Sequence, residues 1–242
     1  MILAAALCPH PPLLLREVTG GEDPVPELRA ACRSALESVL ATRPDVVHLV
    51  GADGAPVTAA SYAPGWAAGA AAGDSGAAPL SLLVGRRLLA EAGWDGAVRE
   101  LPVPVAASPA ECVRLGTGLG GGLGGRDERA ALVVLGDGSA RRGPKAPGYV
   151  DERALPFDAE VLQALRAADA VRLTDLDSDL AAQLLAAGRP AWQVLAGVLP
   201  GLLVTSGGAP VVEVLYADDP FGVQYVVATF GVAAVTGPGV TG

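Results

Sequence analysis

One histidine of this sequence occupies a position suited to chemistry. His10 lies in the segment Cys8-Pro-His-Pro-Pro12, directly after an apolar run over Ile2–Leu7. Prolines on both sides restrict the backbone, and a residue at the carboxyl end of a strand lies at the edge where α/β proteins bind ligands. An imidazole there can serve as a metal ligand or as an acid–base group. A single histidine is also commonly structural, so both roles remain open.

The other histidine of the chain has a different setting. His48 lies inside the apolar segment Val46-Val-His-Leu-Val50. Because the interior of a strand is away from the strand-end cleft, we expect His48 to be a core or sheet-face residue and not a ligand. A metal centre with several imidazoles would have to use these two histidines or turn to other ligand types.

A second candidate segment, Gly136-Asp-Gly-Ser-Ala-Arg-Arg142, follows the hydrophobic run Ala130–Leu135. Asp137, with two arginines close behind, is a candidate for contacting a polar ligand; the alternative is a turn that Asp137 caps. Ser139 as an acyl-transfer nucleophile would need a nearby base and a G-x-S-x-G elbow, and this segment is not such an elbow.

The glycines of Gly116-Thr-Gly-Leu-Gly-Gly121 match the pattern G-x-G-x-x-G. A dinucleotide fingerprint needs a strand before the glycines and a helix after them. Here Ser108-Pro-Ala-Glu111 forms a capping box that begins a helix, and the glycines come at the end of that helix. We therefore interpret them as a flexible helix C-terminus.

Hydrophobic periodicity predicts the order of the elements. Strands are expected over Ile2–Leu7, Asp45–Val50, Val98–Pro102, Ala130–Leu135, Val211–Tyr216 and Val223–Phe230, the last two as a closing hairpin. Helices are expected over Pro26–Thr42, Leu80–Ala92, Pro156–Ala167, Asp177–Ala187 and Pro190–Leu199, and from Ser108 to the glycines at 120–125. This alternation predicts an α/β fold, a single-domain sandwich with a central mixed β-sheet flanked by helices. We expect one domain over residues 1–242, with 235–242 as a flexible tail and Ala59–Ala78 as a long functional or mobile loop.

Composition narrows the classes of function. The formal charge of −9 argues against nucleic acid or an anionic membrane as a partner. The apolar N-terminus is short and lacks a basic flank, and no window of about 18 strongly apolar residues is present, so neither a signal peptide nor a membrane span is predicted. Cys8, Cys32 and Cys112 form no paired motif. Reduced thiols and a cytoplasmic location are expected.

Seven short motifs follow one another along this sequence in a characteristic order and spacing. They are Cys8-Pro-His-Pro-Pro-Leu-Leu-Leu-Arg-Glu-Val18, Arg43-Pro-Asp-Val-Val47, Val134-Leu-Gly-Asp-Gly-Ser139, Gly148-Tyr-Val-Asp151, Pro156-Phe-Asp158, Ala191-Trp-Gln-Val-Leu-Ala-Gly197 and Pro220-Phe-Gly-Val-Gln-Tyr225. Over nearly the whole chain this set resembles the class III extradiol ring-cleavage dioxygenases, the LigB-like superfamily that also contains the Memo proteins. The resemblance is to a small, divergent branch.

The resemblance implies a non-haem Fe(II) site made of two histidines and a carboxylate, plus a further acid–base histidine. The first ligand falls on His10. The second falls on Asp53, the acid–base histidine on Ala140, and the carboxylate near Gly188, where neither Glu nor Asp is adjacent. Ala140 cannot transfer a proton, and loss of a positioned acid–base group typically costs about 10²–10⁴-fold in rate.

Three hypotheses follow. The first is a degenerate extradiol dioxygenase-like protein that has lost the Fe(II) site and acts as a binding, regulatory or non-catalytic subunit with no cofactor. The second is an active metal-dependent dioxygenase or oxidoreductase of catechol-type substrates, in which Fe(II) or another divalent metal is held around His10 by a rearranged ligand set. The carboxylates available for that set are Asp137, Asp151, Asp158 and Glu213.

The third hypothesis is a binder of a small aromatic or carboxylate ligand. Tyr62, Trp66 and Tyr149 would form aromatic walls, and Arg141 or Arg142 would meet an anion. The high apolar fraction also makes a homo- or hetero-oligomer an expectation.

Overall fold

The computed structural model describes all residues except 55–77, 122–127, 206–210 and 232–242. The strands are β1 (Ile2–Cys8), β2 (Val46–Asp53), β3 (Ala97–Pro104), β4 (Ala130–Leu135), β5 (Val212–Asp218) and β6 (Tyr225–Phe230). The helices are η1 (Pro12–Leu14), α1 (Arg16–Thr19), α2 (Pro26–Leu40), α3 (Leu80–Glu91), α4 (Pro109–Gly120), α5 (Ala154–Arg166), α6 (Ala170–Thr174), α7 (Ser178–Gln183) and α8 (Arg189–Thr205). The expected loop up to residue 77 and the expected tail 235–242 lie outside the described residues.

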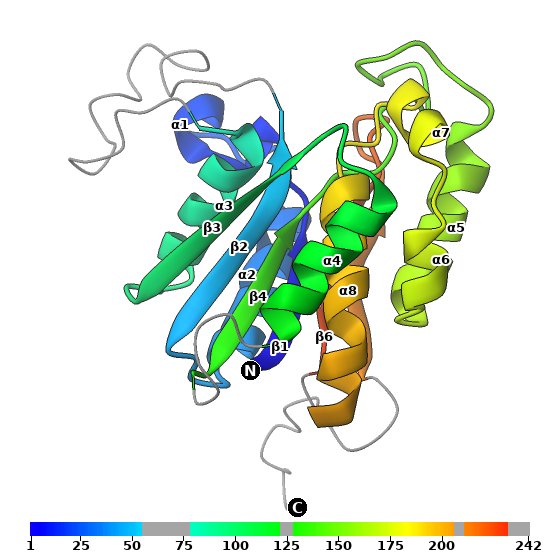
Figure 1. Cartoon of the computed structure of the whole chain (residues 1–242). Coiled ribbons are helices and arrows are strands. Elements are labelled where there is room, and N and C mark those ends of the chain that lie inside the picture. The colour runs from blue at the N-terminus through cyan, green and yellow to red at the C-terminus, as the bar shows by residue number, and fades with distance from the viewer. Residues whose placement is uncertain (55–77, 122–127, 206–210, 232–242) are drawn as a thin grey trace, which may run out of the picture.

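The strands form one six-stranded sheet in the order β3-β2-β4-β1-β6-β5 (Figure 1). The pairs β2–β3, β2–β4 and β1–β4 are parallel, whereas β6 runs antiparallel to both β1 and β5. The closing hairpin expected near the C-terminus is therefore present. The fold is an α/β sandwich with a central mixed sheet flanked by helices, as the sequence predicts.

Helices cover both faces of the sheet (Figure 1). α2 and α3 contact one face, and α8 lies on the other with α4 packed along it. The strand residues alternate between two hydrophobic clusters: in β1, Ala5 and Leu7 belong to one, and Ala4, Ala6 and Cys8 to the other. This period of two is what a strand buried on both faces requires.

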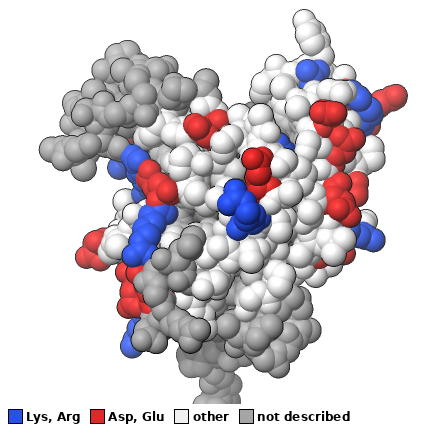
Figure 2. Space-filling view, viewed as in Figure 1, with Lys and Arg blue, Asp and Glu red and all other residues white. Residues whose placement is uncertain are grey.

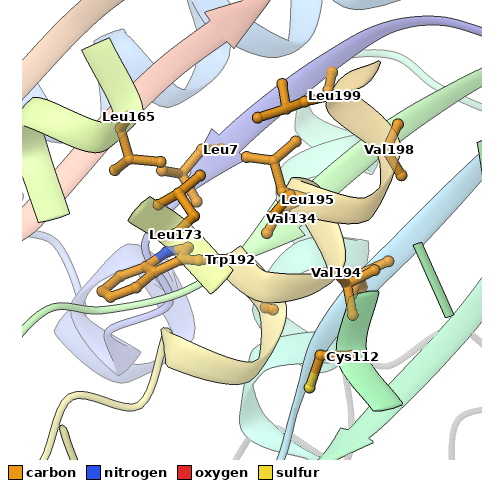
Figure 3. Packing of buried hydrophobic residues seen from close by; sticks show 14 of the residues in the cluster. Leu7, Cys112, Val134, Leu165, Leu173, Trp192, Val194, Leu195, Val198 and Leu199 are labelled. Carbon is orange, nitrogen blue, oxygen red and sulfur yellow. The ribbon is translucent and has the colours of Figure 1, made fainter. Parts of the chain in front are cut away.

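The core on the α8 side is built around one helix. Figure 3 shows Leu195 and Leu199 of α8 close to Leu7 of β1 and Val134 of β4, with Trp192 one turn earlier in the helix. These residues are fully or almost fully buried. α8 is thus the element that holds the carboxyl ends of β1 and β4 against the rest of the chain.

The glycines at the end of α4 have a role that the sequence interpretation missed. They lie within the helix, which confirms that they form no dinucleotide loop. A Cβ on Gly116 would clash with the backbone of Val194 and Gly197 in α8, and a Cβ on Gly197 would clash with the backbone of Val113. Gly116 and Gly197 are therefore contact points between two closely packed helices, and not signs of flexibility.

Some predicted boundaries were wrong. The helix expected over Asp177–Ala187 ends at Gln183, because Leu185 adopts a positive φ of 58°. The last helix passes Pro200 and continues to Thr205, and the burial of Leu202 shows that packing continues beyond the proline. The capping box is confirmed: Ser108 Oγ accepts a hydrogen bond from the Glu111 N–H, and the Glu111 carboxylate accepts one from the Ser108 N–H.

Figure 2 shows the face of the molecule that α4 and α8 form. Acidic and basic side chains are sparse over its middle and intermixed along its right-hand side. Among the described residues, none of the helices combines the length and the apolar character needed to cross a membrane.

Candidate functional site

Three neighbouring parallel strands, β1, β4 and β2, place the predicted site residues at one edge of the sheet. The last residues paired across these strands are Cys8, Leu135 and Gly51. His10, Asp137 and Asp53 each follow two residues later. The strand order puts β4 between the other two, and neighbouring strands are about 4.8 Å apart. Asp137 is therefore the natural neighbour of His10, and Asp53 lies one strand further away.

His10 and Asp137 form a direct contact. The backbone N–H of His10 donates a hydrogen bond of 2.7 Å to Asp137 Oδ1, and the same oxygen lies 3.5 Å from His10 Nδ1. The two side chains are 10% and 15% exposed. His10 Nδ1 is closed to solvent and makes no hydrogen bond to any described residue. The carboxylate thus lies beside one side of the imidazole, and Nε2 is the ring nitrogen on the other side.

The surroundings of this pair are apolar enough to alter its acid–base chemistry. Burial raises the pKa of the Asp137 carboxyl above its ordinary value of 3.8, and His10 offsets the rise only in part. Tyr225, buried at the start of β6, also has a raised pKa, through burial first and the negative charge of Asp137 second. The site therefore disfavours a further negative charge.

The described residues do not supply the donors of an iron triad. Among them, no group of three or more His, Cys, Asp or Glu side chains is placed to hold a metal ion. A first-row divalent metal normally needs three or more protein ligands for tight binding. The donor set around His10 and Asp137 therefore does not fit an Fe(II) centre.

Of the carboxylates considered as replacement ligands, Asp137 contacts His10, whereas the other three are engaged elsewhere or lie apart. Asp151 forms an ion pair with Arg153 at 2.7 Å, and this contact lowers the pKa of Asp151 to about 2. Asp158 binds Ser139. Glu213 lies in β5, on the edge of the sheet and two strands away from β1.

Ser139 is a structural residue. It is fully buried, its Oγ donates a hydrogen bond of 2.5 Å to Asp158, and its N–H donates one of 2.9 Å to the same carboxylate. Its carbonyl accepts the Gln224 N–H, and the Gln224 carbonyl in turn accepts the Gly138 N–H. These bonds fix the loop after β4 to α5 and to the start of β6, and they leave the hydroxyl no access to a substrate.

The two arginines of this loop have different surroundings. Arg142 donates to Asp158 at 3.1 Å and to Asp219 at 2.5 Å, so its charge is satisfied within the chain. Arg141 donates to the carbonyl of Tyr149, and its Nε is closed to solvent with no hydrogen-bond partner in the part of the chain that the structure describes. The Tyr149 side chain is 87% exposed, so it stands away from the protein rather than forming a wall. Tyr62 and Trp66 lie outside the described residues.

Gly188 stands where the resemblance places the carboxylate ligand, and its surroundings are closed. Its N–H donates a 2.8 Å hydrogen bond to the Asp137 carbonyl. A Cβ at this position would clash with the ring of Trp192 and with that carbonyl. A Cβ on Gly136 would also clash with the Trp192 ring, whose Nε1 is buried without a hydrogen-bond partner among the described residues. Trp192 therefore fills the space that a side chain at 188 would need.

The two remaining predicted positions are Ala140 and His48. The N–H of Ala140 donates a hydrogen bond to the Leu184 carbonyl, and its side chain is a methyl group without a transferable proton. His48 lies inside β2, beside Arg99 of β3. Burial, followed by the positive charge of Arg99, lowers the pKa of His48. Its place inside the strand agrees with the sequence interpretation.

Arg189 is the residue that the sequence reasoning missed. It begins α8 and is buried, with 5% exposure. The signal in the sequence was an arginine at the start of the segment over residues 189–199, in which Gln193 is the other polar side chain. Arginine is almost never fully buried without a partner, so the position called for an explanation.

No protein-family model matches the chain, and no curated protein matches it. Among solved structures, the chain is similar to the uncharacterized protein JW3007 from Escherichia coli K12, at 15% identity and a TM-score of 0.49. The similarity covers 94% of this chain and 99% of that protein.

Proposed function

We propose that this protein is a degenerate class III extradiol dioxygenase-like protein that binds a catechol-type ligand at His10 without holding Fe(II). Its role is then that of a binding, regulatory or non-catalytic subunit. The observation that carries the proposal is the His10–Asp137 contact: the carboxylate nearest the imidazole accepts the backbone N–H and faces Nδ1.

The neighbouring positions support the same proposal. Ala140 has no proton to give, and the ring of Trp192 occupies the space beside Gly188. Loss of the acid–base group and of a carboxylate position removes two separate requirements of the family chemistry. What remains is an imidazole whose Nδ1 side is held by a carboxylate, which leaves Nε2 to accept a hydrogen bond from a phenolic hydroxyl.

Calorimetric titration of catechol into chelator-treated protein tests this proposal. We expect saturable binding by the wild type and a loss of about tenfold or more in affinity for His10→Ala, because one hydrogen bond to the ligand is removed in a buried site. His48→Ala is the matched control, since it removes the other histidine from a strand interior, and it should bind catechol like the wild type.

Two outcomes would overturn the proposal. Equal affinity of His10→Ala and the wild type would remove His10 from the site. Catechol binding that occurs only after Fe(II) is added, with consumption of O₂, would show an active metalloenzyme with a rearranged ligand set.

A further inference from the structure

A cavity of about 460 Å³ lies apart from the His10–Asp137 contact. It is enclosed by the loop between β3 and α4, by α7 and by the start of α8. This volume is in the range of about 300–1,000 Å³ that is usual for small-molecule sites. Its walls are mainly small and apolar, with five alanines: Ala106, Ala107, Ala181, Ala182 and Ala186.

The charged group at this cavity is the buried guanidinium of Arg189. Its Nη1 donates to the Ala107 carbonyl at 2.6 Å and to Gln193 Oε1 at 2.9 Å, and its Nη2 donates to the Val105 carbonyl at 2.5 Å. All three acceptors are neutral. Within the described part of the chain, Arg189 forms no ion pair with a carboxylate, in contrast to the buried Arg29 and the partly buried Arg142.

A buried cation without an opposite charge beside it is costly, because hydrogen bonds to neutral acceptors offset only part of the free energy lost when the charge leaves water. Burial lowers the pKa of Arg189, and the opposing effect of the Cys112 thiol is smaller. Proteins use arginine where a carboxylate is recognised, since the planar guanidinium matches a carboxylate geometrically.

The other polar groups around the cavity are less suited to hold an anion. Ser108 is engaged with Glu111 in the capping box of α4. Ser178 and Asp179 lie in the short helix α7, and Asp179 is exposed to solvent. Among the lining residues the cation is thus buried, whereas the carboxylate is exposed to solvent.

We propose that this cavity binds a small organic carboxylate, with the carboxylate group on Arg189 and the apolar body against the alanines. The anion supplies the opposite charge that the chain itself does not place beside Arg189. The alanine walls favour an organic acid over inorganic phosphate, because phosphate has no apolar surface to bury. This site is separate from the proposed catechol site, and neither proposal depends on the other.

NMR titration of the intact chain with benzoate tests the proposal, with benzamide as an uncharged analogue of the same shape and inorganic phosphate as a second anion. We expect benzoate to shift the amide signals of the cavity residues saturably. Benzamide and phosphate should bind at least about tenfold more weakly, since each lacks one of the two features recognised.

Two variants test the role of Arg189 and of the cavity in benzoate binding separately. Arg189→Lys retains the charge but loses the planar donor pair, and it should weaken benzoate binding about tenfold. Ala182→Phe leaves Arg189 intact and places a ring in the cavity from an exposed position, so it should abolish binding. Ala110→Phe, at an exposed position in α4 outside the cavity, is the matched control and should bind like the wild type.

Three results would overturn the carboxylate site. They are the absence of saturable benzoate binding to the wild type, equal binding of benzoate and benzamide, and unchanged benzoate binding by Ala182→Phe. Tighter binding of phosphate than of benzoate would also contradict the proposed class of ligand.

Discussion

Asp137 Oδ1 accepts the backbone N–H of His10 at 2.7 Å and lies 3.5 Å from the Nδ1 of the same residue. One carboxylate oxygen therefore binds the backbone of His10 from the neighbouring strand and lies beside one nitrogen of its ring. The two residues are 127 positions apart in the sequence, and the parallel pairing of β1 with β4 brings them together.

The raised pKa of Asp137 predicts how stability depends on pH. Because the folded pKa lies above the ordinary value of 3.8, the folded chain keeps this proton to higher pH than the unfolded chain. The wild type should therefore lose stability relative to Asp137→Asn as pH rises from 3.8 through the raised pKa. Urea denaturation of both proteins between pH 3.5 and 7, roughly the interval in which a raised carboxyl titrates, measures the difference.

Asp151 provides a control with the opposite sign. Arg153 lowers the pKa of Asp151 to about 2, so the wild type should gain stability relative to Asp151→Asn as pH rises from 2 through 3.8. Parallel slopes for the two variants would contradict the assignment of Asp137 as the buried, destabilised carboxyl.

Ser139→Ala should destabilise the protein without affecting ligand binding. The substitution removes a buried donor to Asp158, and a loss of this kind costs about 1–3 kcal/mol. Chemical denaturation measures the free energy of unfolding, and catechol titration measures binding. Ser38→Ala, which removes an exposed hydroxyl that donates to the Ser34 carbonyl, should change stability by about 0.5 kcal/mol or less. A stable Ser139→Ala variant that no longer binds catechol would point to a direct role for the hydroxyl.

Two glycines in the same helix should respond oppositely to alanine. At Gly197 a Cβ would clash with the Val113 carbonyl of α4, so Gly197→Ala should destabilise the protein by about 1–3 kcal/mol. At Gly201 an added Cβ would meet no atom of the described residues outside its own helix within 4 Å, and Gly201→Ala should stabilise the protein by about 0.5–1 kcal/mol through helix propensity. Thermal unfolding of both variants measures the difference. Equal effects would contradict the close approach of α4 and α8.

A carboxylate placed at 188 should not rebuild a metal site. Gly188→Glu forces a side chain into the space of the Trp192 ring and beside the Asp137 carbonyl. We expect the variant to unfold at lower denaturant concentration than the wild type and to bind no additional Fe(II). A folded Gly188→Glu variant that gained stoichiometric iron would show that the space is not closed.

Periodicity predicted most of the fold because each element carries its own pattern. Ala130–Leu135 is a strand over the predicted residues, and the helix predicted from Pro26 begins there. The wrong predictions concern elements whose ends or existence depend on tertiary contacts. α8 continues past Pro200, and α6 (Ala170–Thr174) is too short to show a periodic pattern.

The candidate site was predictable in part. Placement of His10 and Asp137 at strand ends followed from local hydrophobic runs, but their contact depends on the strand order, which local patterns do not encode. The buried hydrogen bond of Ser139 depends on Asp158, which lies in a later helix of the chain. The clash at Gly188 depends on Trp192, one turn further along the chain in α8. Arg189 could not be placed from the sequence, because its three acceptors come together only in the folded chain.

Iron content after anaerobic loading tests the central claim most directly. The chelator-treated wild type is incubated with excess Fe(II) in the absence of oxygen, desalted, and assayed for bound iron by mass spectrometry. Because the described residues provide no group of three metal ligands, we predict less than about a tenth of an equivalent of iron per chain. One equivalent of tightly held iron that is lost in His10→Ala would contradict the account.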